Sequence, residues 1–231
     1  MKGRRVSLDR PSDADYELIA DWLGPASQAA VMTADAGEYV TPDDLKQLNS
    51  TGRIRQFAVR TDDGRTVGTV NYRQQGPVGN FAIGGAIGDP ELWQQGLGAE
   101  AFDLLIDHLF HARNAHRMQF TTALYNKGVL RMVTRAGFVL EGILRDHHYL
   151  DGAYHHAAIW SLLRYEYYDS LARQEQRNPS YVRPDVIPES AKAQAMDIML
   201  NHLKRPQSET SIQLLLDDAA AAAASSAPGT R

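Results

Sequence analysis

A glycine-rich stretch near the middle of the chain has the residue types that hold an anionic ligand. Trp93-Gln94-Gln95-Gly96-Leu97-Gly98 follows Gly88-Asp89-Pro90, which ends a predicted strand, and it precedes a predicted helix. Glycine lets a backbone approach a ligand closely, and the first N–H groups of a helix are unpaired and carry partial positive charge. The turn therefore suits a phosphate or pyrophosphate. Tight turns also use glycine for steric reasons alone, so that alternative stays open.

Titratable side chains flank this turn and a later predicted hairpin. Asp89 and Glu91 lie beside the turn. Four histidines flank the hairpin: His147, His148, His155 and His156. Histidine has the more suitable ordinary pKa for accepting a proton near neutral pH. A structural interpretation is open for each group, since aspartate is common in turns, glutamate at helix starts, and histidine in solvated hairpins.

The N-terminal third must supply part of the scaffold for these groups. Residues 4 to 9 alternate as in a strand, and Pro11-Ser12-Asp13 offers a helix start. A second helix is predicted from about Pro42 to Leu48, and a strand from Ile54 to Arg60 follows it. Asp63-Gly64 then indicates a hairpin, because both residues tolerate positive φ.

The segments around and after the turn alternate between strands and helices. A helix is predicted from Gly98 to Arg113, and Asn126 caps a short helix that ends at Gly137. Strands are predicted at Phe81 to Ile87, Met118 to Leu124, Phe138 to Arg145 and Tyr154 to Leu163. This order predicts a mixed α/β (α+β) architecture built on one sheet.

Five short segments follow one another with a characteristic order and spacing. They are Trp93 to Ala101, Asn114-Ala115-His116-Arg117, Asn126 through Ala136-Gly137-Phe138, Glu141-Gly142-Ile143-Leu144-Arg145 and Trp160-Ser161-Leu162-Leu163. Together they resemble the Rim-like branch (ribosomal-protein-alanine acetyltransferase type) of the GNAT superfamily of N-acetyltransferases. The resemblance runs from Arg5 to about Tyr168.

The resemblance implies a GNAT fold, which is a mixed central sheet of about seven strands, flanked by helices, with a V-shaped splay between strands four and five. It implies acetyl-CoA, or another acyl-CoA, as cofactor and no metal, with pantetheine lying along the fourth strand like an added strand. The expected cofactor-binding residues are Ala86, Ile87, Gln95, Gly96, Leu97, Gly98, Ala99, Asn126, Lys127 and Arg131. Asn126 can cap its helix and contact the cofactor at once.

Catalysis in this family is direct attack of a neutral primary amine on the thioester, with the developing oxyanion held by a backbone N–H near the end of the fourth strand. The candidates for taking the ammonium proton are Asp89, Glu91 and His156. The acid that protonates the thiolate is missing: the family's Ser and Tyr positions hold Val129 and Val133. A thiol of pKa about 8.5 can still leave as thiolate and take its proton from water.

The turn also departs from the family because Gln94 and Gln95 stand where basic residues are usual. Compensation is expected from Lys127, Arg131 and Arg135, which form one basic stripe at spacings of four. A solvated charged face is an equal alternative for this stripe.

Composition sets broad limits on the function. With 231 residues, 24 Lys and Arg against 28 Asp and Glu and no cysteine, the chain predicts one domain with an appendage, without thiolate chemistry or general nucleic-acid binding. No apolar run approaches the roughly 20 residues that span a bilayer, so a soluble cytoplasmic protein with no membrane partner is expected. The expected domains are a GNAT domain at 1–168, an extension at 169–218 with a possible helix at Glu189 to Leu203, and a disordered tail at 219–231.

The main hypothesis is transfer of an acetyl group to a primary amine of a protein N-terminus or a small molecule. The alternatives are a longer acyl-CoA or acyl-carrier-protein donor, and a CoA-binding module without catalysis. The amine side is expected at the first helix and the loop from Pro25 to Tyr39, where Asp35, Glu38, Asp43 and Asp44 would suit a cationic amine. The apolar side of the extension favours a homodimer.

Overall fold

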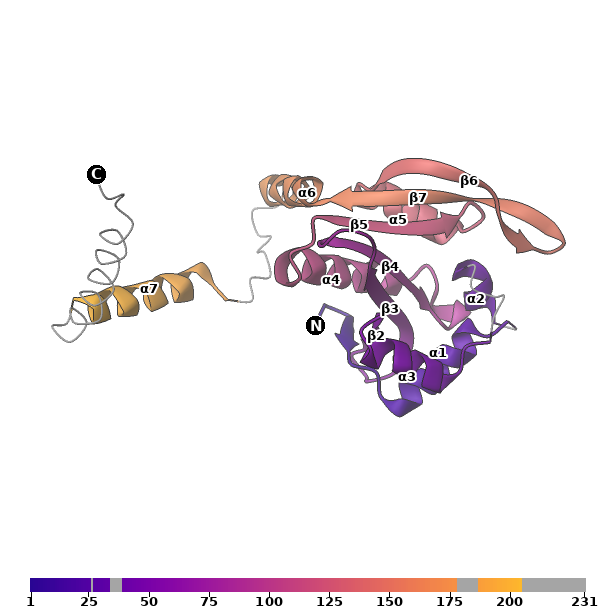
Figure 1. Cartoon of the computed structure of the whole chain (residues 1–231), viewed down its shortest axis with the longest axis horizontal. Coiled ribbons are helices and arrows are strands. Elements are labelled where there is room, and N and C mark those ends of the chain that lie inside the picture. The colour runs from indigo at the N-terminus through magenta and orange to yellow at the C-terminus, as the bar shows by residue number, and fades with distance from the viewer. Residues whose placement is uncertain (26, 34–38, 178–186, 205–231) are drawn as a thin grey trace, which may run out of the picture. The chain divides into compact units, whose positions relative to one another are not determined.

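Seven strands form one mixed sheet in the order β1-β2-β3-β4-β5-β7-β6 (Figure 1). The strands are β1 (Val6–Asp9), β2 (Arg55–Thr61), β3 (Thr66–Gln74), β4 (Asn80–Ile87), β5 (Arg117–Ala123), β6 (Val139–Leu150) and β7 (Ala153–Leu163). Every neighbouring pair is antiparallel except β4 and β5, which are parallel. The predicted mixed architecture with about seven strands is confirmed.

The parallel pair separates after a short contact. β4 pairs with β5 at three positions, from Asn80 opposite Arg117 to Ala82 opposite Gln119. Beyond Ala82, β4 remains paired with β3 as far as Ile87, while β5 remains paired with β7. Figure 1 shows the two strands diverging from each other in this part of the sheet. The predicted splay between strands four and five is therefore present.

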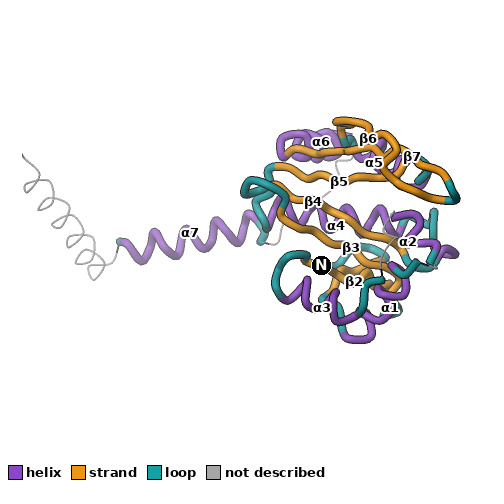
Figure 2. Tube along the Cα trace, turned by 45° about the vertical axis from the view of Figure 1, so that its right-hand side comes forward, coloured by secondary structure: helices purple, strands orange, loops and turns teal. Residues whose placement is uncertain are grey.

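The computed structural model describes residues 1–25, 27–33, 39–177 and 187–204. The chain consists of two compact units, Met1–Arg177 and Asn178–Arg231. The helices of the first unit are α1 (Asp13–Leu23), α2 (Gln28–Thr33), α3 (Pro42–Ser50), the 3-10 turn η1 (Pro90–Leu92), α4 (Leu97–Ala112), α5 (Lys127–Ala136) and α6 (Arg164–Arg177). Both ribbon views place α1 and α3 beside β2 and β3 (Figure 2).

Capping side chains explain where two of the N-terminal helices begin. Ser12 accepts from the backbone N–H of Asp15, whose carboxylate accepts from Ser12 in return, and this capping box starts α1. Thr41 and Asp44 form the same arrangement at the start of α3. Asp15 is buried, and its carboxylate also accepts from Thr66 at 2.6 Å and pairs with Arg60. The first helix is therefore fastened to the sheet through its own cap.

Helix α4 contributes one buried apolar face to the core. Its apolar face, which includes Leu105 and Leu109, is fully buried. On its flank, the ring of His108 lies 6.2 Å from Phe57 and 6.4 Å from Tyr72 between ring centres. A helix packed across β1, β3 and β4 holds its own N-terminus at a fixed place beside the end of β4.

Three segments differ from their prediction. The expected loop from Pro25 to Tyr39 contains α2, which lies against both β4 and β5. β6 extends to Leu150, because it stays paired with β7 past an irregularity between Leu144 and His148. The predicted boundary after residue 168 falls inside α6, whose Tyr167 ring stacks 4.5 Å from Phe110 of α4. Aromatic packing thus extends the first unit to Arg177.

The second unit contains α7 (Glu189–Leu203), which matches the predicted helix. Residues 219–231, predicted as a disordered tail, lie outside the described residues. Among the residues that the structure describes, no helix is long and apolar enough to cross a membrane.

Candidate active site

The turn before α4 presents unpaired backbone donors. Gly96 caps the helix in the left-handed region, with φ at 82°, and no side chain caps it. Within the described part of the chain, the backbone N–H groups of Leu97, Gly98 and Ala99 have no acceptor. These three donors lie at the positive end of a 16-residue helix. The predicted anion turn is therefore an open helix N-terminus beside the end of β4.

The register of β4 defines which of its backbone groups face the opening. The N–H of Gln75 donates to the carbonyl of Asn80 at 3.0 Å, and the N–H of Gly88 donates to Val67 at 2.9 Å. In an antiparallel ladder such residues alternate with residues whose polar groups point to the other side. Even-numbered residues of β4 therefore bond to β3, whereas odd-numbered residues point their polar groups toward β5.

Past the contact with β5, the odd-numbered side of β4 is a free strand edge. Gly85 and Ile87 have their backbone polar groups on this edge, and Ala86 has its own on the β3 side. The indole of Trp93 donates to the carbonyl of Ile87 at 2.8 Å, which ties the glycine turn to the strand end. A Cβ on Gly85 would lie 2.5 Å from the carbonyl oxygen of Thr69, so glycine permits the close approach of β3 and β4 here.

Asn126 caps the N-terminus of α5, the helix that follows β5. Its side-chain oxygen accepts from the backbone N–H of Val129 at 3.1 Å, which confirms the predicted cap of α5. Its side-chain nitrogen donates to the carbonyl of Met32 in α2 at 2.9 Å. Asn126 is 8% exposed. One side chain thus caps α5 and fastens it to α2.

Tyr125 makes a second bond to α2 from the β5 arm, by which we mean the end of β5, the start of α5 and the adjoining part of β7. Its hydroxyl donates to the carbonyl of Val31 at 2.9 Å, and its ring meets His155 edge-on at 5.2 Å. Burial, with a smaller effect from Asp151, raises the pKa of Tyr125, so its hydroxyl remains a donor at neutral pH. Tyr125 could not be predicted as a site residue from the sequence, because a lone tyrosine before a helix cap belongs to no motif.

The predicted basic stripe lies on α5 and is exposed. Lys127, Arg131 and Arg135 recur at spacings of four, and no described residue forms an ion pair with them. The stripe starts at the same end of α5 as Asn126. Its three cations are therefore available to an anion or to solvent.

The two carboxylate candidates follow β4. Asp89 accepts from the backbone N–H of Glu91 at 2.9 Å and caps η1, so its predicted turn role is confirmed. Glu91 is exposed, and its carbonyl accepts from the side chain of Gln95 at 3.0 Å. Both carboxylates therefore lie between the free edge of β4 and the start of α4.

His156 lies on the other arm, where β7 continues past the end of β5. The N–H of Leu124 donates to the His156 carbonyl at 3.0 Å. Its ring Nδ1 accepts from the backbone N–H of Asp146 at 2.9 Å and lies 3.3 Å from the Asp146 carboxylate. In the neutral ring this places the proton on Nε2. His156 would accept a proton at Nδ1 only by giving up the backbone bond.

The remaining histidines pair across the same hairpin. His148 lies opposite His155, and the rings of His147 and His148 are 4.6 Å apart. Burial and these histidine neighbours lower the pKa of His148. His148 is therefore neutral at physiological pH. Its sequence position alone does not distinguish it from the other three histidines.

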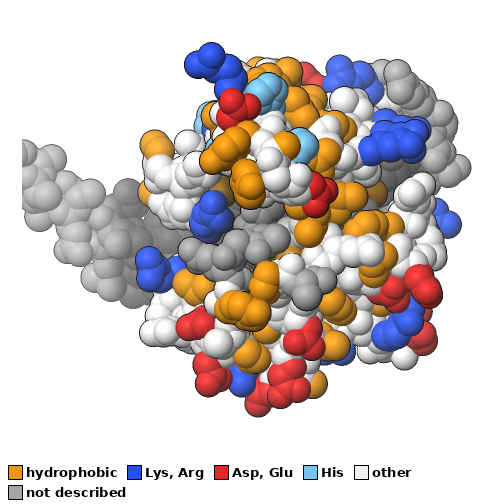
Figure 3. All heavy atoms as spheres, turned by 90° about the vertical axis from the view of Figure 1, so that its right-hand side faces the viewer, with side chains coloured by type: hydrophobic (Ala, Val, Ile, Leu, Met, Phe, Trp, Pro, Cys, Tyr) orange, Lys and Arg blue, Asp and Glu red, His pale blue; other side chains and the backbone are white. Residues whose placement is uncertain are grey.

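Charge is unevenly distributed over the end of the molecule where the arms diverge. Figure 3 shows acidic side chains gathered at the lower end of this face, where Figure 1 places α1 and α3. Asp13 of α1 and Asp43 of α3 both pair with Lys46, at 3.0 and 3.6 Å. Asp44 lies on α3 as expected, whereas Asp35 and Glu38 lie outside the described residues. Histidines and apolar groups occupy the upper part, over β6 and β7.

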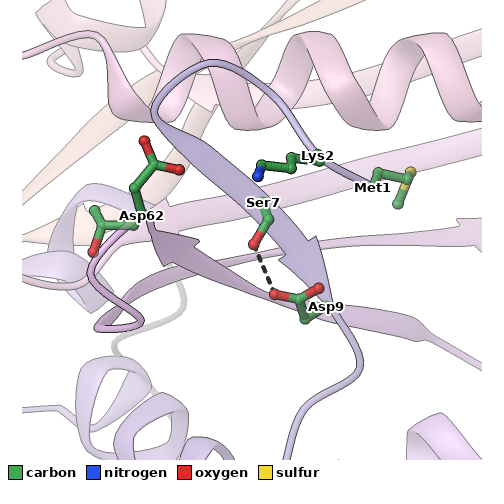
Figure 4. A pocket seen from close by; sticks show the side chains of 6 residues that line it. Met1, Lys2, Ser7, Asp9 and Asp62 are labelled. Carbon is green, nitrogen blue, oxygen red and sulfur yellow. Dashed lines mark hydrogen bonds between the residues drawn. The ribbon is translucent and has the colours of Figure 1, made fainter.

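A separate hollow of about 320 Å³ lies at the β1 edge of the sheet (Figure 4). Met1, Lys2, Ser7, Asp9 and Asp62 line it, and the hydroxyl of Ser7 donates to Asp9 at 2.7 Å. It is far along the sheet order from β4 and β5 and contains none of the predicted site residues. We therefore place the candidate site at the splay and not in this hollow.

Arg5 is a site neighbour that the sequence analysis missed. Its guanidinium donates to the carbonyl of Gln95 at 2.7 Å and to Glu100 at 3.0 Å. Arg5 precedes the turn by about 90 residues, and spacing along the sequence gives no sign of this contact. The packing of β1 against α4 brings it there.

The sequence is similar to known proteins of one family. The sequence matches the family model described as acetyltransferase (GNAT) domain over residues 5–139. An uncharacterized N-acetyltransferase p20 of Bacillus licheniformis is 27% identical over 127 residues, which are 53% of this chain and 70% of the relative. The probable N-acetyltransferase YjcK of Bacillus subtilis is 30% identical over 103 residues, which are 44% of this chain and 56% of the relative.

Solved structures share the fold. A spermidine N-acetyltransferase of Vibrio cholerae, in complex with CoA and spermine, matches 71% of this chain and 98% of its own, with TM-score 0.61 and 20% identity. A ribosomal-protein-S5-alanine acetyltransferase of Vibrio fischeri matches 72% and 97%, with TM-score 0.57 and 21% identity. Because the family model matches more than half of the sequence, this chain belongs to the GNAT acetyltransferase family and is an N-acetyltransferase.

Proposed function

We propose that the chain is a Rim-like, acetyl-CoA-dependent N-acetyltransferase whose acceptor is a primary amine on a protein N-terminus or a small molecule. The observation that carries the proposal is the open N-terminus of α4 at the end of a strand that has parted from its parallel neighbour. The five Rim-like segments support the branch, and one structural neighbour of that type shares the fold.

The backbone groups present at the splay fit acyl-CoA. Unpaired N–H groups of Leu97, Gly98 and Ala99 would hold the pyrophosphate, with Gln95 and Gly96 shaping the turn. The free edge of β4 would hold the pantetheine amides as an added strand does. Because of the register, Gly85 and Ile87 would make those bonds, and Ala86 would contribute its side chain. No metal enters this proposal.

Acyl-CoA supplies an activated thioester carbonyl, and the chain supplies position and charge. A backbone N–H on the free edge, at Gly85 or Ile87, would stabilise the negative charge that develops on the carbonyl oxygen. Asp89 or Glu91 on one arm, or His156 on the other, would take the ammonium proton. Lys127 and Arg131 would meet the adenosine phosphates from α5, with Asn126 beside the pantetheine end.

Acidic side chains on α1 and α3 support a cationic acceptor. Glu17 and Asp21 follow Asp13 at spacings of four on the exposed side of α1. The C-terminal end of α1 reaches the end of β4, since a Cβ on Gly88 would fall 2.0 Å from the Trp22 ring. A negative surface leading to the strand end raises the local concentration of an ammonium group.

The test is calorimetric titration of the whole chain with acetyl-CoA, followed by measurement of thiol release with spermidine and with a peptide that begins with alanine. Binding together with turnover of either amine supports the proposal. Binding with no turnover on these and wider amines would instead support a CoA-binding module, for which the valines at positions 129 and 133 are the motive. Tighter binding and faster turnover with a longer acyl-CoA would assign a different donor.

Self-association is proposed on the second unit. In α7, Met196, Met199 and Leu200 are 60%, 52% and 46% exposed and lie on one side of the helix. An apolar row of this kind favours packing against another surface, and we propose a homodimer. Truncation should follow Arg177, so that α6 stays intact. If the truncated chain keeps the oligomeric state of the parent in light scattering, the role of α7 is refuted.

A further inference from the structure

Arg5, the residue just before β1, reaches into the glycine turn. Its Nη1 donates to the carbonyl of Gln95 at 2.7 Å, and its Nε donates to Glu100 at 3.0 Å. Arginine has five N–H donors in a rigid fork, and Nη2 has no acceptor among the described residues. This nitrogen lies 3.1 Å from the position that a Cβ on Gly96 would occupy. The guanidinium therefore borders the turn directly.

Glu100 makes this contact electrostatically important. Its carboxylate lies in the first turn of α4, 18% exposed, and accepts from the backbone N–H groups of Arg4 and Arg5 at 2.6 and 2.8 Å. Burial would raise its pKa, but the bonds from Arg5 and Arg4 hold that pKa below its ordinary value. Glu100 is therefore a fixed negative charge beside a turn that suits an anion.

The carbonyl oxygen of Gln95 would also repel an anion bound at the turn. Its oxygen carries partial negative charge and belongs to the residue that immediately precedes the helix cap Gly96. The bond to Arg5 fixes this oxygen on the β1 side of the turn. The peptide unit is thereby held with its N–H side available to a ligand.

We infer that Arg5 is the positioning residue of the acyl-CoA turn and supplies the cation that Gln94 and Gln95 lack. It neutralises Glu100 and fixes the Gln95 carbonyl away from the pyrophosphate. This inference rests on the proposed function. It also explains how a turn with two glutamines can serve a dianionic group, because the guanidinium of Arg5 is brought to the turn from a distant part of the sequence by the packing of the adjoining strand β1 against α4.

The experiment uses the whole chain and compares two acyl donors, acetyl-CoA and acetyl-pantetheine. Arg5→Met should raise the KM for acetyl-CoA about tenfold while kcat changes less than twofold, because the turn contacts the donor and not the reacting amine. With acetyl-pantetheine, which has no pyrophosphate, the KM should not change. Arg5→Lys should lie between parent and Arg5→Met, since it keeps the charge and loses the fork.

A matched control and a rescue separate charge from folding. Arg4→Met removes the neighbouring exposed arginine but keeps its backbone bond to Glu100, so its KM should equal that of the parent. Adding Glu100→Gln to Arg5→Met should restore part of the lost affinity by removing the uncompensated carboxylate. Equal loss with both donors, or no rescue, would make Arg5 a structural clasp and refute the inference. If the parent itself binds no acetyl-CoA, the proposed function fails and not merely the role of Arg5.

Discussion

Two helices start at the ends of the two splayed strands, and they start in opposite ways. α4 follows β4 with a glycine cap and unpaired N–H groups, whereas α5 follows β5 with the Asn126 side chain bonded to the N–H of Val129. A helix end that lacks a side-chain cap leaves its donors for water or a ligand, and a capped end uses one of them for stability. On this contrast we propose that the end of β4 and the start of α4 bind the ligand, whereas the end of β5 and the start of α5 hold the fold together.

The other helices of the first unit sharpen this contrast. α1 and α3 both begin with complete capping boxes, and η1 is capped by Asp89. Each of these caps is a short polar side chain that the sequence could reveal. An open terminus amid capped ones indicates selection for something other than helix stability.

Gly96→Asp should weaken acetyl-CoA binding about a thousandfold, which is about 4 kcal/mol. The new carboxylate would repel the pyrophosphate, and it would also attract the guanidinium of Arg5, which lies 3.1 Å from the Cβ position. Titration calorimetry measures the effect.

Gly137→Asp is the matched control for that substitution. Gly137 ends α5 with φ at 79°, close to the 82° of Gly96, and a Cβ there meets nothing within 4 Å. The two variants therefore carry a similar conformational cost. If Gly137→Asp loses binding to the same degree, the open terminus of α4 is not the anion site.

Asp15→Asn should lower the free energy of unfolding by about 3 kcal/mol at pH 7, because it removes the buried carboxylate that pairs with Arg60 at 2.5 Å and leaves that guanidinium only the longer contact with Asp9 at 3.8 Å. Burial opposes ionisation of Asp15, but hydrogen bonds from Thr66 and Ser12, with Arg60, lower its pKa below the ordinary value. The stabilisation is thus complete above the ordinary pKa of 3.8 and is lost as pH falls through the lower folded pKa. Urea unfolding should show parent and variant converging in acid.

Asp44→Asn serves as the comparison, because Asp44 holds the same capping-box position on α3 but is exposed. It should cost much less stability than Asp15→Asn. Equal losses would mean that the cap alone, and not the buried bonds to the sheet, determines the effect at Asp15.

Much of the fold could be read from the sequence, for local reasons. Asn126 and Gly137 mark the two ends of α5, and Asp63-Gly64 marks the β2–β3 hairpin. The long-range contacts of the site could not be read in this way. Arg5 meets Gln95 through the packing of β1 on α4, and no periodic pattern records that meeting.

The β5 arm shows the same limit. Asn126 was selected both as a cap and as a cofactor residue, and the structure adds the bond to Met32 that no spacing rule contains. α2 was missed because six residues are too few for a helical period to stand out. Motifs therefore locate the proposed cofactor turn better than they locate contacts such as Asn126 to Met32, which depend on how α2 packs.

Asn126→Ala should lower the free energy of unfolding by about 2 kcal/mol, from loss of the α5 cap and of the bond to Met32. Acetyl-CoA affinity should fall less than threefold if this terminus is closed for stability. Asn126→Asp keeps the cap oxygen and loses the donor, so it isolates the bond to α2. A tenfold loss of affinity with unchanged stability would show that Asn126 acts on the cofactor instead.

Gln95→Lys should strengthen acetyl-CoA binding by about threefold at low salt, which is below 1 kcal/mol, because it returns a cation to the open terminus. The gain should vanish at high salt, where an exposed charge is screened. Gln95→Met is the control, since it also removes the side-chain bond to Glu91 but adds no charge. A Lys variant that binds no better than the Met variant would mean that Arg5 already meets the electrostatic need of the turn, and the open terminus would then owe its charge balance to β1 alone.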